Sequence, residues 1–468
     1  MTTTDPLDQG ALAQAALVRA GQLSSVELVR GYLARIARLN SRLHAFVDVH
    51  ERRALAAARR ADDARSRWRA SGAAGPRPLF DGVPIGIKDT DAVRFAWNRA
   101  GSRAYRYVWM PVDAPAIALL RRAGFVILGK TSTSELALMP VVETDLHAPT
   151  ATPWNLAHSA GGSSGGSASA VAAGLLPIGH AADGGGSIRI PASFCHLFGF
   201  KASRGTIPDF YAAMDHVGLS VMGSVAHHVE DAAAVLDVYR GDGTFPAPPA
   251  ALAVSAREAP PRGLRIALCL RSPIAAVDPE IAGAVERIAH VLEGLGHHVE
   301  PVEPPAGVLD DFLPVYGRLA ANPPALGERH FQPVTRWLRE IGRRVTKAEA
   351  VEANARLAAR IVAWFGDYDL ALSPTVGRPV PRIGEFDGLA PEAQFRAAAE
   401  LGGFTAAFNM TGQPSASIPA GISAAGLPMG AMLTARRGED LALLRLCHTL
   451  EKLLEWPSKR PALTKSVW

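Results

Sequence analysis

Three short segments of the sequence combine serine, lysine and glycine in patterns that suit acyl-transfer chemistry. In the first, LFDGVPIGIKDT, Lys88 follows a short apolar run. A lysine at that place is partly desolvated, which lowers its pKa and makes the neutral amine available as a base. In the second, HSAGGSSGGSASAVAAG at residues 158–174, Ser163 and Ser164 lie between two pairs of glycines. The third, DGGGSIRIPASFC, has Ser187 directly after three glycines.

The three consecutive glycines before Ser187 predict a cradle of backbone donors. With no side chains in the way, their successive N–H groups can form a concave nest that binds a developing oxyanion. A serine hydroxyl at the end of such a turn is a candidate nucleophile. Glycine-rich turns are common, so the prediction depends on the combination of all three segments.

Two other interpretations of the serine-rich block fit less well. A phosphate-binding loop needs a lysine after its last glycine, which this block lacks. GGSSG also matches the G-x-S-x-G nucleophile elbow with Ser163 at its centre, but the elbow requires a buried strand before it, and WNLAHSA does not read as one. The nearby His158, His180 and His196 could supply the base of a Ser-His-Asp arrangement. Because Lys88 already provides a candidate base, we expect these three histidines to have structural roles.

The composition excludes several classes of protein. Of 468 residues, 48% are hydrophobic and 20% are charged, as in a packed globular protein, and the net charge is only +5. The arginines are scattered, so we expect no nucleic-acid partner. Three widely separated cysteines suit neither a disulfide framework nor a zinc cluster; we expect no metal, no cofactor and a cytoplasmic location. Neither a signal peptide nor an apolar run of about 18 residues is visible, so we expect no membrane association.

Local signals mark the ends of two predicted helices. Ser24 and Glu27 form a capping-box pattern ahead of apolar residues at helical spacing. Asp278 and Pro279 open a second helix, which ends near the glycines at 294–296.

The order of the elements predicts an α/β fold. Residues 1–70 read as a helical segment, and from 75 to 240 short apolar runs such as FVILG and LLPIGHAAD alternate with helical stretches. A Pro- and Ala-rich stretch at 239–262 reads as a loop or linker, and residues 262–468 resume the alternation. We expect one large domain over residues 1–468, in which helices cover both faces of a central, mixed and twisted sheet that the C-terminal half completes.

Together and in this order, the segments resemble the amidase signature family. The resemblance runs through LFDGVPIGIKD, GKTSTSELA, TPWNLAHSAGGSSGGSASAVAAG and DGGGSIRIPASFCHLFGFKASRG, and continues more weakly to FNMTGQPSASIPAG and LPMGAML. It implies the family's Ser–Ser–Lys catalytic set, with Ser187 as the nucleophile, Ser163 as the bridging serine and Lys88 as the base. In this family the bridging serine follows a cis peptide. The interval from Ser163 to Ser187 is the one expected of the family.

The same resemblance gives roles to the residues around Ser187. The oxyanion hole would be formed by the backbone N–H groups of Gly184, Gly185, Gly186 and Ser187. Asp183, Arg189 and Ser164 would brace the loop, with a purely structural role as the alternative for the first two. The family usually has threonine or isoleucine at the position of Gly184, so the acyl site is expected to be wider here.

The resemblance implies an amidase that cleaves apolar or aryl amides through a Ser187 acyl-enzyme, with carbamates (urethanes) and esters as further substrates. Segments 137–155 and 205–225 line the substrate entrance in this family. The apolar pocket is predicted to include Leu136, Leu138, Met139 and Phe404. We expect a small-molecule substrate and a monomer or homodimer. The alternative is an amidotransferase subunit that releases ammonia from glutamine together with partner subunits.

Overall fold

The computed structural model describes residues 5–73, 75–241, 252–305, 307, 309–324 and 327–465. The strands of the main sheet are β1 (Phe46–Val49), β2 (Pro84–Lys88), β5 (Val126–Thr131), β8 (Ile178–Asp183), β9 (Phe198–Lys201), β10 (Val221–Ala226), β11 (Arg265–Leu268), β12 (His298–Pro301), β13 (Leu370–Pro374), β14 (Ser415–Ile422) and β15 (Pro428–Ala435). Two small ribbons pair β3 (Ala96–Trp97) with β4 (Trp109–Met110) and β6 (Ala151–Thr152) with β7 (Asn155–Ser159).

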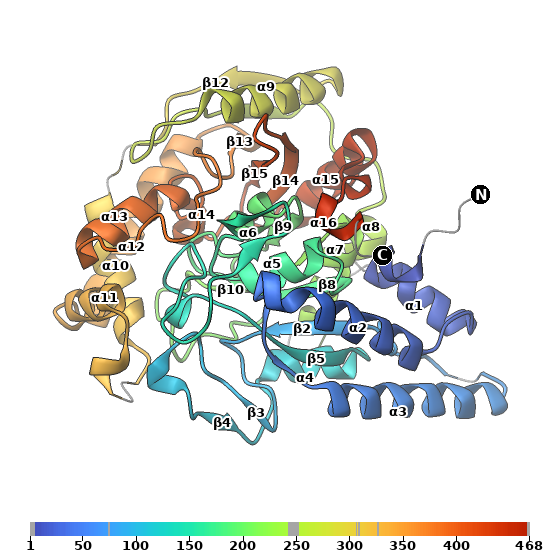
Figure 1. Cartoon of the computed structure of the whole chain (residues 1–468). Helices are drawn as coiled ribbons and strands as arrows, with labels where there is room; N and C mark the ends of the chain where they lie inside the picture. The colour runs from blue at the N-terminus through green and yellow to red at the C-terminus, as the bar shows by residue number, and fades with distance from the viewer. Residues whose placement is uncertain are drawn as a thin grey trace.

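The helices surround this sheet (Figure 1). They are α1 (Ala11–Ala20), α2 (Ser25–Leu43), α3 (Glu51–Ala70), α4 (Pro115–Arg122), α5 (Gly165–Ala172), α6 (Arg189–Phe194), α7 (Val229–Arg240), α8 (Leu252–Ser255), α9 (Pro279–Gly294), α10 (Leu309–Ala321), α11 (Pro333–Arg343), α12 (Lys347–Phe365), α13 (Pro391–Ala399), α14 (Ala407–Thr411), α15 (Asp440–Leu454) and α16 (Ala462–Lys465). None of the helices in the described ranges is both long and apolar enough to cross a lipid bilayer.

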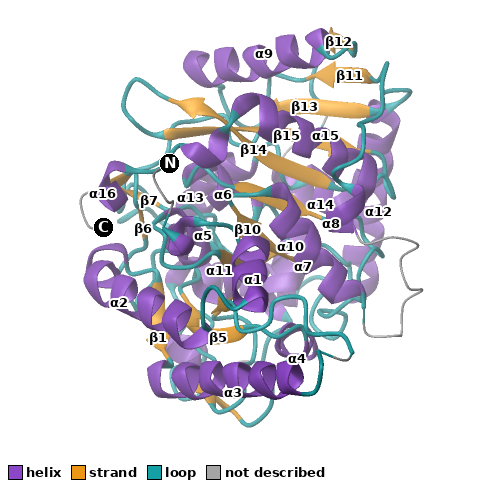
Figure 2. Ribbon diagram, turned by 90° about the vertical axis from the view of Figure 1, so that its right-hand side faces the viewer, coloured by secondary structure: helices purple, strands orange, loops and turns teal. Residues whose placement is uncertain are grey.

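The main sheet has eleven strands in the order β1-β5-β2-β8-β10-β9-β14-β15-β13-β11-β12. It is mixed, because β2 runs parallel to β5 and β8 whereas β10 is antiparallel to β8. Figure 2 shows it passing from β1 and β5, beside α3, to β11 and β12, beside α9. The predicted α/β class, with a mixed sheet between helices, is confirmed.

The predicted helix signals are confirmed as well. The Ser24 side chain accepts from the Glu27 N–H, and the Glu27 carboxylate accepts from the Ser24 N–H, which is a complete capping box at the start of α2. Asp278 caps α9, and Pro279 occupies its first turn. Both signals act locally, which explains why the sequence alone locates them.

The sheet joins the two halves of the chain through the pairing of β9 with β14, in which Lys201 lies opposite Ser415. Of the predicted linker, residues 242–251 lie outside the described residues. On either side of them α7 ends at Arg240 and α8 begins at Leu252.

Alternation along β2 determines where Lys88 points. Ile85 and Ile87 are fully buried in the apolar core that includes residues of α4 and α7. Successive side chains of a strand point to opposite faces, so Lys88 does not share the face of Ile87. It lies on the face where α5 packs against β2; α5 is formed by the second half of the serine-rich block.

Candidate active site

The structure brings Lys88 and Ser163 into direct contact. Lys88 Nζ lies 2.7 Å from Ser163 Oγ and 3.3 Å from the carbonyl oxygen of Ala182. The exposed fraction of each side chain is at most 1%. The peptide bond between Gly162 and Ser163 is cis, which is the feature expected at the bridging serine.

Burial sets the protonation state of Lys88. Loss of hydration lowers the pKa of its ammonium group to about 8, although the carboxylates of Asp91 and Asp183 act in the opposite direction. The neutral amine is therefore populated near neutral pH and dominates above pH 8. A hydroxyl at 2.7 Å from this nitrogen can pass its proton to it.

Ser187 lies in the turn between β8 and α6, close to the bridging serine. The N–H of Ser164 donates to the carbonyl oxygen of Ser187 at 3.3 Å, and the Ser164 hydroxyl donates to Ala182. Ser187 itself is half-buried and lines a cavity, in contrast to the sealed Ser163. The arrangement puts one serine within reach of a substrate and the other beside the base.

Asp183 and Arg189 form a fully buried ion pair that ties the turn together. Arg189 Nε lies 2.9 Å from Asp183 Oδ2, and its second nitrogen donates to Oδ1 at 3.0 Å. The guanidinium holds the pKa of the Asp183 carboxyl far below its usual range, against the opposing effect of burial. The same carboxylate accepts from the N–H groups of Gly186 (2.7 Å) and Ile188 (3.1 Å). A two-point arginine–carboxylate contact of this kind fixes orientation as well as distance.

The donor set differs from the expectation at Gly186. Its N–H donates to Asp183, so it is committed to the turn and is not free to bind an oxyanion. The φ of Gly186 is +131°, and a Cβ there would lie 2.2 Å from Thr405 Oγ1, so the position needs glycine for conformation and for space. A Cβ on Gly185, by contrast, would meet no other atom within 4 Å. Among the described residues, no protein partner accepts from the N–H groups of Gly184, Gly185 or Ser187.

Two residues of the C-terminal half complete the turn and escaped the sequence analysis. Asn409 Nδ2 donates to the carbonyl and the carboxylate of Asp183, each at 2.9 Å, and Arg189 donates to Asn409 Oδ1 at 2.6 Å. The Thr405 hydroxyl donates to the carbonyl of Gly185 at 2.7 Å. The segment FNMTG, which carries Asn409, was part of the resemblance, but nothing local in it pointed to a partner more than 200 residues away.

The histidines near the serines take structural positions. His180 Nδ1 accepts from the backbone N–H of Lys88 at 3.3 Å, and burial lowers the pKa of its ring to about 4. His196 packs edge-on against Trp154. His158 forms an isolated β-bridge with Arg382. Lysine is the base that the geometry offers.

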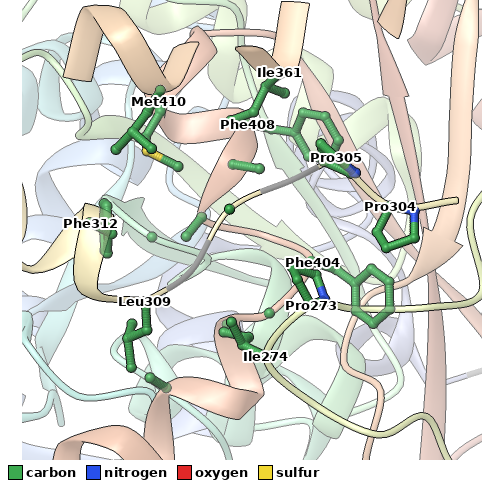
Figure 3. Close-up of a pocket in the computed structure, with 18 of the residues that line it drawn as sticks. Pro273, Ile274, Pro304, Pro305, Leu309, Phe312, Ile361, Phe404, Phe408 and Met410 are labelled. Atoms are coloured by element: carbon green, nitrogen blue, oxygen red, sulfur yellow. The ribbon is translucent and has the colours of Figure 1, made fainter. Parts of the chain in front are cut away.

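A cavity of about 170 Å³ opens beside Ser187 and is lined mainly by apolar side chains. Figure 3 shows Pro273 and Ile274, Pro304 and Pro305, and residues of α10, α12 and the α14 region facing this space. Leu138, Met139 and Phe404, three of the residues expected in the substrate pocket, are among those that line this cavity. Leu136 does not: its φ of +50° belongs to a turn, and its side chain packs against the apolar cluster of α10, α11 and α13.

Comparison with known proteins assigns this geometry to a family. The Amidase family profile matches residues 27–444. The 6-aminohexanoate-cyclic-dimer hydrolase of Paenarthrobacter ureafaciens is 34% identical over 501 residues, which cover 97% of this chain and 97% of that protein. A structure of 6-aminohexanoate cyclic dimer hydrolase complexed with substrate has a TM-score of 0.87 and 32% identity, over 98% of this chain and 100% of its own. A bacterial aryl acylamidase of the amidase signature family has a TM-score of 0.84 and 25% identity, over 97% and 99% of the two chains.

The likeness covers the turn at residues 183–189, the sheet and the C-terminal half alike, since profile, sequence and structure each span most of the chain. The chain belongs to the amidase signature family and is an amidase, a hydrolase of amide C–N bonds.

Proposed function

We propose that Ser187 attacks the substrate carbonyl and that Lys88 acts as the base through Ser163. The Ser187 proton moves to Ser163 as the Ser163 proton moves to the neutral amine of Lys88. The new O–C bond gives a tetrahedral oxyanion, bound by the N–H groups of Gly184, Gly185 and Ser187. Lys88 returns its proton through Ser163 to the leaving nitrogen, and the C–N bond breaks to leave an acyl-enzyme. Water then repeats the sequence and releases the acid.

One observation carries this proposal. Lys88 Nζ lies 2.7 Å from Ser163 Oγ, and both groups are buried. Ser187 lines the cavity, and its carbonyl oxygen accepts from the N–H of Ser164, the residue that follows Ser163. Burial favours the uncharged amine, which the relay needs. The cavity limits where a substrate carbonyl can lie, and this adds the benefit of positioning.

We further propose that the substrates are apolar or aryl amides, and that carbamates and esters are cleaved by the same serine. Most of the cavity wall is supplied by apolar side chains, among them Leu, Ile, Phe, Met and Pro, with Arg271 as a charged member; this lining favours uncharged, apolar acyl groups. An ester or carbamate places the same carbonyl against the same donors. The related cyclic-dimer hydrolase and aryl acylamidase are named for amide substrates.

The test uses the single purified chain and p-nitroanilides of increasing acyl length, with the matching p-nitrophenyl esters and an aryl carbamate. We expect the chain alone to release nitroaniline. The esters should give a faster initial burst of nitrophenol, and the mass of the chain should increase by that of the acyl group, bound at Ser187. Hydrolysis of glutamine that requires added partner subunits, without release from any anilide, would instead establish the amidotransferase alternative. Cleavage of anilides but not of carbamates or esters would limit the proposal to amides.

A further inference from the structure

We propose that Tyr316, on α10, is a positioning residue for the bridging serine. It acts through a strained turn at residues 134–141, which we call the buttress turn. The inference rests on the proposed roles of Ser163 and Lys88 and adds a residue that the Ser–Ser–Lys set does not contain.

The buttress turn touches the backbone that carries Ser163. A Cβ on Gly162 would lie 2.8 Å from the Met139 carbonyl oxygen and 2.9 Å from backbone atoms of Pro140 and Val141. The turn is therefore packed directly against the peptide that precedes the bridging serine. Any shift of the Met139 carbonyl changes the space available to Gly162 and hence the position of Ser163 relative to Lys88.

The turn is held in a conformation that its residues disfavour. Leu136 and Ala137 both have positive φ values, 50° and 60°, although neither is glycine. The left-handed region costs an ordinary residue about 1–2 kcal/mol, so neighbouring contacts must hold these two in place. Several contacts do so: Leu136 N–H donates to the Ala100 carbonyl at 2.8 Å, and Glu135 accepts from Ser102 and from the Gln332 N–H, each at 2.7 Å.

Tyr316 supplies a further contact to the turn, at Leu138. Its hydroxyl donates to the carbonyl oxygen of Leu138 at 2.8 Å, one residue before the carbonyl that packs on Gly162. The ring is fixed by Phe312 and Phe395, with centroids 5.2 and 5.8 Å away. Burial raises the pKa of its hydroxyl well above the ordinary value, so the group remains a donor throughout the working range. Tyr316, Leu138, Met139 and Ser187 all line the same cavity.

Tyr316→Phe removes this one donor and keeps the ring. The Leu138 carbonyl is then left without its side-chain donor, and we expect kcat per active site to fall about tenfold while KM changes less than about twofold. Active sites are titrated with a fluorophosphonate, and the rate of its reaction with Ser187 should fall in parallel with kcat. Tyr368→Phe is the matched control, because its hydroxyl bonds to Glu300 at 3.0 Å and Tyr368 is not among the residues that line the cavity; it should leave kcat unchanged.

Ala137→Gly provides a second test, in which the strain of the buttress turn is relieved, because glycine adopts a positive φ without strain. In that background the turn depends less on its tether, and Tyr316→Phe should lower kcat only about twofold to threefold. An unchanged kcat in Tyr316→Phe overturns the inference, as does a rise in KM alone or an equal loss in the Ala137→Gly background. If the wild-type chain does not react with the fluorophosphonate at Ser187, the proposed function itself fails, which is a separate result.

Discussion

The turn at residues 183–189, which carries the proposed nucleophile and is called the catalytic turn below, lies beside the cavity wall. The two regions are held together by different kinds of interaction. In the turn, Asp183, Arg189 and Asn409 are almost wholly buried, and each makes several hydrogen bonds of defined length. In the wall, side chains such as Ile361 and Phe404 belong to a cluster of buried apolar residues. The polar region fixes the positions of protons, whereas the apolar region only limits the shape and polarity of what can enter.

The difference predicts how each region responds to change. A buried charge or donor that loses its partner keeps the full cost of its desolvation. An apolar wall can repack after a substitution, and the stabilising free energy that it loses scales with the apolar area or volume removed. Substitutions in the turn should therefore affect all substrates alike, while substitutions in the wall should discriminate between substrates.

The largest effect is expected at the nucleophile. Ser187→Ala should lower kcat by about 10⁶-fold, the order seen when a serine nucleophile is removed elsewhere, and for every substrate of the acyl series. Anilide hydrolysis and the mass of the fluorophosphonate-treated chain measure it. Ser71→Ala, at an exposed position, is the control. Residual turnover above about one per cent would place the nucleophile elsewhere.

Lys88→Met should come next, with a loss of about 10²–10⁴-fold in kcat, because it removes the base and leaves the nucleophile in place. The apolar replacement suits a site that is 1% exposed, so folding should be retained and is checked by thermal unfolding. The exposed Lys452→Met serves for comparison. A variant that keeps normal rates would show that the base is another group.

Arg189→Met tests how far the turn depends on its ion pair. Breaking a buried pair costs about 3–5 kcal/mol, so the free energy of unfolding should fall by this amount. The kcat should fall by a similar factor for short and long acyl groups, since the turn serves them equally. Denaturant unfolding and the acyl series measure the two effects. A loss confined to long acyl groups would contradict the division between turn and wall.

Ile361→Ala tests whether the cavity wall selects substrates by the size of their acyl group. We expect kcat/KM to fall about tenfold for a long apolar acyl group and less than twofold for the acetyl analogue, because only the longer group reaches this side chain. Val362 is its neighbour on α12 but is 55% exposed, so Val362→Ala should change neither value. Equal losses for both substrates would mean that α12 supports the catalytic turn as well.

The smallest effect is a shift in pH dependence. Only the neutral amine of Lys88 accepts a proton, so kcat/KM should rise with pH through a pKa of about 8. The Asp91 carboxylate stabilises the ammonium form and raises this pKa; Asp91→Asn should therefore move the rise toward lower pH. A pH–rate profile measures it. Should the rise stay in place or move upward, the assignment of the titrating group to Lys88 would be wrong.

The sequence predicted most of the fold and the part of the site that lies in short motifs. Helix caps such as Ser24 and Asp278 depend on neighbours within a few residues, so they can be located without a structure. The juxtaposition of Lys88 and Ser163 came from the family resemblance, since nothing in their spacing fixes a contact between residues 75 positions apart.

What the sequence could not supply depends on distant partners and on backbone direction. Asn409 was missed because its partner Asp183 lies 226 residues earlier. Backbone conformation accounts for two further differences from the predictions. The Gly186 N–H donates to Asp183, and Leu136 does not line the cavity; both residues have positive φ values that could not be predicted from the residue types. Leu138 and Phe404 could be anticipated because apolar residues beside a catalytic turn commonly line its pocket.

The bonds from Arg189 to Thr405 and Asn409 also bear on the synthesis of the protein. A nascent polypeptide that has emerged only as far as residue 400 already contains both serines, the lysine and Asp183, but it lacks Thr405 and Asn409, two further partners of Arg189. Arg189 can therefore make its bonds to Thr405 and Asn409 only after ribosomal elongation has passed residue 409. Final ordering of the turn around Ser187 is thus linked to synthesis of the C-terminal half of the chain.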